Sequence, residues 1–368
     1  YVFALRENSR GNIFIGSYNS VFMEYIYDSD IFQKIELPGC DPKAYISDIT
    51  EDSSGNVWIG TSKSGLYRLN NDRKFVTRYG TQNSAPSEII SSDNVSSLYF
   101  NESDSKLHIG TITEGLNIQN LNDSKISCIN FKEQHPESDR INNITFIFRD
   151  SRSILWIGTH YGMFRLDEET NKLLSLINEK FDKICFTKKS VSDICEDLQG
   201  KLWISTQDRG LYCYDCTDES LVRFQFDKNT ENGLICNSIK RLLRDRSNVI
   251  WIGTKGEGLG KIDRQQNEFH HLINHQSNSG NREINVVRSI YRDSEENYWI
   301  GTFYDGLFKL KENKDKSFNF TKLEETEKNK VTCIQEDSRK NIWITYQTYG
   351  IACYSLTEEK FTFRPLDL

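Results

Sequence analysis

The cysteines and the paired carboxylates are the residues of this sequence with the greatest chemical potential. Cys213 and Cys216 have the Cys-x-x-Cys spacing of a zinc or redox site, but no second Cys pair or His pair completes four ligands. The total of nine cysteines is odd and irregularly spaced, which does not indicate a disulfide framework. The alternative to a zinc or redox site is that these cysteines are small apolar strand residues, and the sequence favours it.

Carboxylate pairs occur at Glu51-Asp52, Glu196-Asp197 and Glu336-Asp337. A catalytic acid is normally unique in a chain, whereas these pairs recur at one place in a repeated pattern. We therefore interpret them as residues that cap turns. The sequence contains no nucleophile elbow, no P-loop and no His-Glu-x-x-His motif. It predicts neither catalytic residues, nor a metal site, nor a cofactor.

Aromatic side chains stand beside planar polar side chains in eight short loops. Such a mixture suits a polar ligand with apolar faces, above all a carbohydrate, because rings stack on the sugar while polar groups bind its hydroxyls. The candidate ligand-binding residues are Tyr18, Lys63, Glu114, His160, Tyr161, Asp208, Arg209, Lys255, Glu257, Tyr304, Asp305, Gln347 and Tyr349.

A further segment is basic, with Lys180, Lys183, Lys188 and Lys189. Together with Arg209 it would favour a negatively charged sugar. The alternative is a charged loop that is only solvated.

These loops belong to a unit that recurs along the whole chain. Its core is Trp-Ile-Gly-Thr, complete at Trp58, Trp156, Trp251 and Trp299. Looser copies begin at Phe14, His108, Trp203 and Trp343, so the aromatic position returns every 44 to 50 residues. A period of this size indicates an array of one supersecondary unit.

Each unit contains four short β-rich runs separated by polar turns. In the second unit, 45–49 is strand A, 56–61 is strand B, 66–69 is strand C and 74–79 is strand D. Asp52 and Gly55 lie in the A–B turn, where Asp can accept bonds from backbone amides and Gly can take a positive φ. Four antiparallel strands per repeat predict an all-β propeller.

The repeat fills the chain, so we predict a single β-propeller domain over 1–368. Eight blades that close as a ring are preferred, and seven blades are the alternative. The expected blades are 1–40, 41–88, 89–137, 138–184, 185–232, 233–280, 281–327 and 328–368.

We interpret the repeated Trp-Ile-Gly-Thr core of the unit as structural and not as a binding site. Strand B is apolar on both sides, as in a sheet covered on both faces. The Trp would supply buried area between blades, and the Gly would leave room for a side chain of the adjacent blade.

Two kinds of connection distinguish the two faces of the predicted disc. The A–B and C–D turns are short and alike, and strand alternation places them on one face. The D–A connections and B–C loops lie on the other face, and the D–A connections are long and dissimilar, as at 80–94, 132–143 and 274–285. Binding usually occurs on such variable loops, although they could also be plain spacers.

Composition excludes other classes. A net charge of −7 argues against a general nucleic-acid binder, which needs clustered positive charge. No run of about 18 apolar residues is present. The chain begins at Tyr1, and we expect it to be an excised piece of a longer protein.

The unit Ile-x-Glu-Asp-Ser-x-Gly-Asn-x-Trp-Ile-Gly-Thr-(x)3-Gly-Leu-Tyr-x-Leu resembles the two-component regulator propeller repeat. The copies that carry the resemblance are 49–69, 194–214 and 334–354, and it extends over essentially the whole chain. The Gly-His and Trp-Asp pairs of WD40 blades are absent. Phe14 and His108 in place of Trp, and Ser205 and Thr345 in place of Gly, weaken single copies only.

The resemblance implies the periplasmic sensor region of a hybrid two-component histidine kinase of Bacteroidetes. Such a region has two propellers and a β-sandwich domain, and it forms a homodimer anchored by a membrane segment that is not present here. It would detect an oligosaccharide, control glycan-utilisation genes and leave catalysis to other domains. Two further readings stay open. One is a structural propeller for dimerisation or inter-propeller packing, and the other is a glycan-active enzyme.

Overall fold

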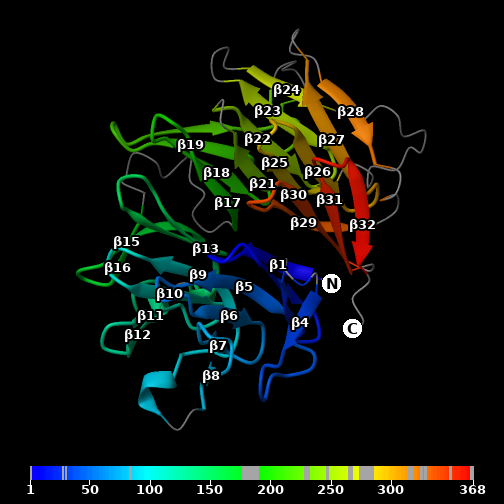
Figure 1. Cartoon of the computed structure of the whole chain (residues 1–368). Coiled ribbons are helices and arrows are strands. Elements are labelled where there is room, and N and C mark those ends of the chain that lie inside the picture. Colours follow the sequence, from blue (N-terminus) through cyan, green and yellow to red (C-terminus); the bar gives the residue numbers. More distant parts are fainter. Residues whose placement is uncertain are drawn as a thin grey trace. The chain divides into compact units, whose positions relative to one another are not determined.

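The structure is a computed structural model of the chain. It describes residues 2–26, 29, 31–82, 85–136, 138–175, 190–227, 233–245, 248–263, 268–272, 286–313, 318–323, 326, 330–347 and 350–364. These residues form eight antiparallel sheets of four strands each (Figure 1). The prediction of an all-β propeller with eight blades is confirmed, and the seven-blade alternative is wrong.

The blades fall into two compact units, Val2–Asn178 and Glu179–Asp367, which we call the N-terminal and C-terminal units. The strands of the N-terminal unit are β1 Val2–Glu7, β2 Ile13–Ser17, β3 Phe22–Ile26, β4 Ile31–Ile35, β5 Ile46–Glu51, β6 Val57–Thr61, β7 Leu66–Leu69, β8 Val76–Tyr79, β9 Val95–Asn101, β10 Lys106–Thr111, β11 Leu116–Asn120, β12 Lys125–Ile129, β13 Ile144–Arg149, β14 Leu155–Thr159, β15 Gly162–Asp167 and β16 Lys172–Ser175. Three short 3-10 helices, η1 Pro86–Glu88, η2 Phe131–Glu133 and η3 Asp139–Asn142, lie in its D–A connections.

The C-terminal unit holds the other four blades. Its strands are β17 Val191–Glu196, β18 Leu202–Thr206, β19 Leu211–Asp215, β20 Ser220–Phe224, β21 Ile239–Arg244, β22 Ile250–Thr254, β23 Leu259–Asp263, β24 Glu268–Leu272, β25 Val287–Arg292, β26 Tyr298–Thr302, β27 Leu307–Glu312, β28 Phe318–Lys322, β29 Val331–Glu336, β30 Asn341–Tyr346, β31 Gly350–Ser355 and β32 Lys360–Arg364.

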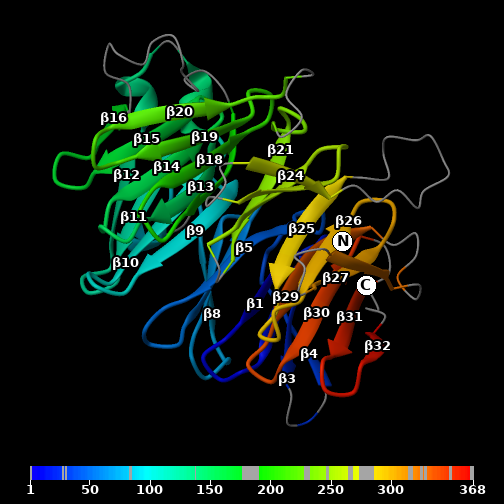
Figure 2. The same ribbon diagram turned by 90° about the horizontal axis from the view of Figure 1, so that it is seen from above.

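Within each blade the strands follow one another in chain order, as β13 to β16 show in Figure 2. In each unit, the A strands of two consecutive blades are joined directly. Asp48 of β5 accepts a hydrogen bond from the amide of Leu98 in β9 at 2.8 Å, and Asp193 of β17 accepts one from Leu242 in β21 at 3.0 Å. Carboxylates of the A strands therefore connect neighbouring blades.

A buried aspartate organises the A–B turn of six blades. In the second blade, Asp52 Oδ1 accepts bonds from the amides of Ser54 and Asn56 at 2.9 and 3.0 Å. Its Oδ2 accepts the indole N–H of Trp58 at 2.9 Å. The same bond to Trp Nε1 is present at Asp150, Asp197, Asp245, Asp293 and Asp337, at 2.6 to 3.0 Å. The turn-capping interpretation of the repeated carboxylates is confirmed.

One position of this turn has a positive φ in every blade. Gly55 takes it at 75°, as expected for glycine, but Glu296 and Lys340 take it at 71° and 66°. A non-glycine residue in this region costs about 1 kcal/mol or more. The aspartate, rather than glycine, is therefore the common determinant of the turn.

The indoles fill the space between consecutive blades. Trp58 packs on Val95, Leu98 and Ile109 of the third blade and is fully buried. Trp203, Trp251 and Trp299 pack in the same way on the blades that follow them. The predicted role of these residues as interblade packing is confirmed.

The glycine after Trp-Ile allows the next blade to approach. A Cβ on Gly60 would lie 2.8 Å from Val95 Cγ1, and one on Gly253 would lie 3.0 Å from Val287 Cγ1. At Gly158 the space is filled by Phe146 of the same blade. The expected reason for glycine holds at Gly60 and Gly253, whereas at Gly158 the close neighbour belongs to the blade's own A strand.

Two blades carry a hydroxyl residue in place of this glycine. Ser205 Oγ lies 3.0 Å from Ser192 Oγ, and Thr345 Oγ1 lies 2.7 Å from Thr332 Oγ1. Each pair joins strand B to the A strand of the same blade. The hydroxyl therefore has a partner inside its own blade.

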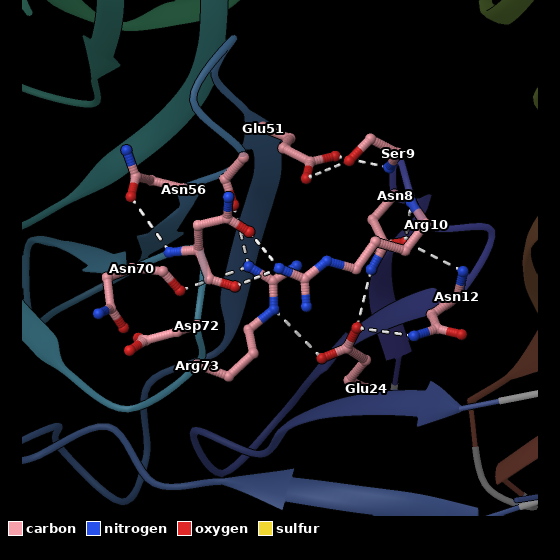
Figure 3. Close-up of polar contacts among 12 residues, drawn as sticks. Asn8, Ser9, Arg10, Asn12, Glu24, Glu51, Asn56, Asn70, Asp72 and Arg73 are labelled. Atoms are coloured by element: carbon pink, nitrogen blue, oxygen red, sulfur yellow. Dashed lines mark hydrogen bonds and ion pairs between the residues drawn. The ribbon is translucent and has the colours of Figure 1, made fainter.

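The first blade replaces the Asp–Trp bond by an ion pair (Figure 3). Phe14 has no indole N–H, and Asn8 stands in the aspartate position. Glu24 of β3 accepts bonds from the side chains of Asn8 and Asn12 at 2.8 and 3.1 Å. Arg73 of the second blade lies 3.3 Å from Glu24 and 5.0 Å from the Phe14 ring centroid. The buried charge of Glu24 is thus neutralised by the neighbouring blade.

The boundary of the third blade also has an ion pair in place of the Asp–Trp bond. His108 stands in place of Trp, fully buried, with its Nε2 3.6 Å from Glu168 Oε1 of the fourth blade. Arg149 donates two hydrogen bonds to Glu168 at 2.8 and 3.0 Å. The imidazole of His108 and the guanidinium of Arg149 lower the pKa of Glu168 to about 2.

We predict that Asp52→Ala destabilises the protein by about 3 kcal/mol or more, because it leaves several buried donors without an acceptor. Trp58→Phe removes only one donor and should cost about 1 kcal/mol. Urea denaturation followed by circular dichroism measures both. The exposed carboxylate of Asp72, in the C–D turn of the same blade, is the control, and Asp72→Ala should change stability by less than about 0.5 kcal/mol. Equal costs for Asp52→Ala and Asp72→Ala would contradict the role of the turn.

A second prediction concerns pH. Because the folded pKa of Glu168 is about 2 and its ordinary value is 4.5, its ionised form stabilises the fold above pH 4.5. This stability, about 3 kcal/mol at most, is lost as the pH falls from 4.5 to 2. In Glu168→Gln the free energy of unfolding should depend less on pH in this window. A variant with an unchanged pH slope would show that Glu168 does not carry the effect.

Candidate functional site

The B–C loops carry the predicted ligand-binding residues. Tyr349 lies outside the described residues, and the other twelve all lie between the second and third strands of their blades. Lys63, Asp208, Arg209, Lys255 and Glu257 are exposed. Tyr18, Glu114, His160, Tyr304, Asp305 and Gln347 are half-buried. Tyr161 is only 8% exposed and belongs to the hydrophobic core of its unit.

A threonine fixes the shape of these loops. Thr302 Oγ1 donates to the carbonyl of Gly306 at 2.9 Å and accepts the amide of Asp305 at 3.0 Å. Thr206 does the same with Gly210 and Arg209, at 2.9 and 3.0 Å. Corresponding pairs of bonds occur at Thr61, Thr111, Thr159 and Thr254. The Thr of Trp-Ile-Gly-Thr therefore holds the loop residues in a defined conformation.

The loops are also bound to the chain that leads into strand A. The amide of Lys255 donates to Ser238 O at 2.9 Å, and the amide of Phe303 donates to Val286 O at 2.9 Å. On the other side, the amide of Gly210 donates to Asn237 O of the next blade at 2.9 Å. In each unit the B–C loops and D–A connections thus share one face, which confirms that prediction.

The D–A connections are fixed at their base by side chains that sequence reasoning did not identify. Asn142 Oδ1 accepts the amide of Phe131 at 2.9 Å, and Asn237 Oδ1 accepts the amide of Phe226 at 2.8 Å. Asp93 accepts the amide of Thr81 at 3.1 Å in the same way. The sequence feature that could have identified these side chains is an Asn or Asp two residues before strand A.

The structure brings aromatic and basic side chains together in the C-terminal unit. The rings of Phe303 and Tyr304 meet edge to face, with centroids 4.4 Å apart. Arg288 Cζ lies 4.2 Å and Lys330 Nζ lies 4.4 Å from the Phe303 centroid. Lys330 Nζ is also 5.8 Å from the Tyr304 centroid. Of the predicted residues, Tyr304 is part of this group.

Three basic members of the group were missed, namely Lys240, Arg288 and Lys330. Lys240 and Arg288 lie at a bulge in strand A, between two residues that pair in register with strand B. A bulge places two residues opposite one and changes the direction of a side chain, and strand alternation does not reveal it. The basic segment 180–189 that sequence reasoning favoured lies outside the described residues.

Two A strands carry buried carboxylates, Asp48 and Asp193. Burial raises the pKa of Asp48 to about 6 and also raises that of Asp193. Perturbed carboxylates can mark active sites. Here, however, both oxygens of each residue accept backbone amides, including that of the next blade. Their geometry is that of a connection between blades.

The described ranges contain no group of three or more His, Cys, Asp or Glu able to hold a metal ion. Cys213 lies on β19, packed against the hydrophobic core, and Cys216 lies in the turn that follows. Within the same residues there is no helix with the length and hydropathy needed to cross a membrane.

The fold is an eight-bladed β-propeller, and within each unit the variable B–C loops and D–A connections share one face. A sequence model described as "Two component regulator propeller" matches residues 41–63, 233–256 and 282–304. The chain therefore carries repeats of the two-component regulator propeller family. No curated protein sequence matches it.

Solved structures with the same fold include two from B. thetaiotaomicron. The extracellular domain of the putative hybrid two component system BT4673 is 17% identical, with a TM-score of 0.55, and the match covers 99% of this chain and 54% of that one. The extracellular domain of the putative hybrid two component system BT3049 is 20% identical, with a TM-score of 0.50, covering 100% and 53%. The C-terminal WD40 domain of Sif2 is 10% identical, with a TM-score of 0.64, covering 96% and 98%. The chain thus spans about half the length of the two extracellular domains.

We predict that Thr302→Val loosens the loop 303–305, because it removes a hydroxyl that both donates and accepts a buried hydrogen bond. The cost in folding free energy should be about 1 to 2 kcal/mol. Amide hydrogen exchange should rise about tenfold or more at Asp305. Thr321→Val, on the exposed side of β28, is the matched control and should leave exchange at Asp305 unchanged. Equal exchange in the two variants would refute the loop-fixing role.

Proposed function

We propose that this chain is a ligand-sensing propeller from the periplasmic part of a hybrid two-component signalling protein. Its ligand is an oligosaccharide, and its output is control of glycan-utilisation genes. The observation that carries the proposal is the contrast between a repeated scaffold and unlike B–C loops, six of which are held by a threonine. The propeller-repeat match and the similarity to extracellular domains of putative hybrid two-component systems support it.

The chemistry of the loops supports a sugar as ligand. A saccharide presents hydroxyls on its rim and C–H groups on its ring faces, so it needs planar polar groups beside aromatic rings. The half-buried Tyr304 and Phe303 offer rings, while Gln347 and Asp305 offer an amide and a carboxylate in the neighbouring and same loops. Fixed loops also reduce the entropy that binding would cost.

Signalling requires further parts of the protein. Because the chain spans about half of the similar extracellular domains, we propose that a second propeller and a β-sandwich domain complete the sensor. A histidine kinase beyond a membrane segment would carry the catalysis, and a homodimer would transmit the change. The propeller itself would bind no nucleic acid.

A second candidate function is packing against the neighbouring propeller of the same polypeptide. The outermost D strands expose large apolar side chains, with Ile31 and Val222 about half exposed, at 50% and 51%. Leu174 and Phe363 are exposed at 40% and 41% on equivalent strands. Such residues on sheet edges suit contact with another protein surface.

Calorimetric titration with an oligosaccharide panel tests the sensing function. We predict that at least one oligosaccharide binds this chain and that Tyr304→Ala and Arg209→Ala weaken it about tenfold without unfolding. The exposed Lys360 is the first residue of β32, at the end of the strand away from the B–C loops, so Lys360→Ala is the control and should bind normally.

The outcomes separate the functions. No binding by this chain, together with binding by the complete extracellular region, would exclude direct sensing and favour the packing role. Binding that survives both loop substitutions would place the site elsewhere. Turnover of a bound sugar would instead establish a glycan-active enzyme.

A further inference from the structure

Four cationic side chains gather on the loop face of the last three blades. They are Lys240 and Arg288 near the start of their A strands, Lys255 in a B–C loop, and Lys330 just before β29. Lys255 and Arg288 are exposed, and Lys240 and Lys330 are half-buried. None of the four forms an ion pair with another described residue, although the chain as a whole carries a net charge of −7.

The repeat shows that two of these cations are additions to the scaffold. The bulge residue of strand A is a serine or threonine in five other blades: Ser47, Ser96, Thr145, Ser192 and Thr332. Only the sixth and seventh blades have a charged residue there, Lys240 and Arg288. Since five blades form the same bulge with a small hydroxyl side chain, folding does not require the charges.

The positive charges of these side chains repel one another. Burial, followed by the charges of Lys255, Arg241 and Arg288, lowers the pKa of Lys240. Burial also lowers the pKa of Arg288. Arg241 differs from the other four because the carboxylate of Asp193 is near it.

The acidic residue of the Lys255 loop is Glu257, and within the described residues it forms no ion pair with the four cations. Like charges in partly desolvated positions are destabilising unless a counter-charge joins them. Within the described residues, no carboxylate is therefore paired with these four positive charges.

An aromatic surface lies beside the charges. Arg288 and Lys330 both contact the Phe303 ring, at 4.2 and 4.4 Å from its centroid, and Tyr304 meets Phe303 edge to face. Contacts between cations and a ring attract the charged groups to the ring face without neutralising their charge. The backbone is fixed as well, since Lys255 forms an antiparallel bridge with Val286 and the amide of Gln347 donates to Lys330 O at 2.8 Å.

We propose that this basic–aromatic cluster (Lys240, Lys255, Arg288, Phe303, Tyr304 and Lys330) binds the acidic group of a saccharide, a carboxylate or a sulfate. The inference rests on the proposed sensing function and adds the charge of its ligand. The guanidinium and ammonium groups bind the anion, and an aromatic ring packs against the sugar that carries it. Bonds of this kind are charge-assisted and roughly twice as strong as neutral ones.

The test is calorimetric titration of the whole chain at low ionic strength with three probes: lactose, a sulfated lactose and digalacturonic acid. The key variant is Lys240→Ser with Arg288→Thr, which gives the sixth and seventh blades the residues that other blades have at the bulge. The control is Lys340→Ser with Lys360→Ser, which removes the same charge from the opposite face of the last blade. Circular dichroism checks that both variants fold.

We expect an acidic probe to bind at least about tenfold more tightly than lactose, and less tightly as salt is added. The bulge variant should lose this preference, and the control variant should keep it. Preference for digalacturonic acid would identify a carboxylate, and preference for sulfated lactose a sulfate. Lactose binding as tightly as the acidic probes, or a preference that survives in the bulge variant, would overturn the inference and leave oligosaccharide sensing intact. Absence of binding by all three probes and by the neutral panel would overturn both.

Discussion

The buried hydrogen bond between an aspartate and an indole is the interaction on which the rest of the structure depends. One oxygen of the aspartate organises the turn between strands A and B, and the other fixes the tryptophan that fills the space to the next blade. A single side chain thus joins local turn geometry to interblade packing. Because the carboxylate is buried, loss of its partners is costly, and this keeps the motif recognisable in six blades.

The two exceptions show which part of the motif is essential. The first and third blades lack the tryptophan, and a glutamate–arginine pair lies next to the substituting ring at each of these two blade boundaries. In both cases the arginine comes from the following blade. The common feature is therefore a paired carboxylate beside an aromatic ring at the blade boundary, and the residues that supply it can change.

The sequence was sufficient to predict the blades because their determinants are local. Within one unit, the Asp-containing turn and the Trp-Ile-Gly-Thr core lie within the segment 49–69 and specify strands, turns and faces. The regular return of this segment along the chain then indicates the blades. Glycine was a poorer guide to the turn, since Glu296 and Lys340 adopt the same backbone conformation. The loops that carry the predicted residues were also located correctly, because they follow directly from strand order.

The composition of the candidate site was less predictable. From the sequence, Tyr161 is expected to be an aromatic residue of a binding loop, but the structure places it in the hydrophobic core. Its loop is one residue shorter than the other threonine-bonded loops, and the ring turns inward. Lys240 and Arg288 are absent from the predicted site residues, because a bulge is a property of strand register and leaves no periodic signal in the sequence. Lys330 approaches Phe303 only through the fold. What remained hidden was therefore the set of contacts between blades.

The hydroxyl pairs between strands A and B have a consequence for how such a propeller can evolve. In the fifth and eighth blades, Ser205 and Thr345 are bonded to the bulge residues Ser192 and Thr332, so a change at either position removes one hydrogen bond of the other. The sixth and seventh blades have Gly253 and Gly301 at this place, and their bulge residues are Lys240 and Arg288. These two positions should covary among related chains, with charged residues appearing only in blades that retain the glycine. Interblade packing alone would explain this glycine. Its presence thus also determines in which blades the bulge position can change to a charged residue.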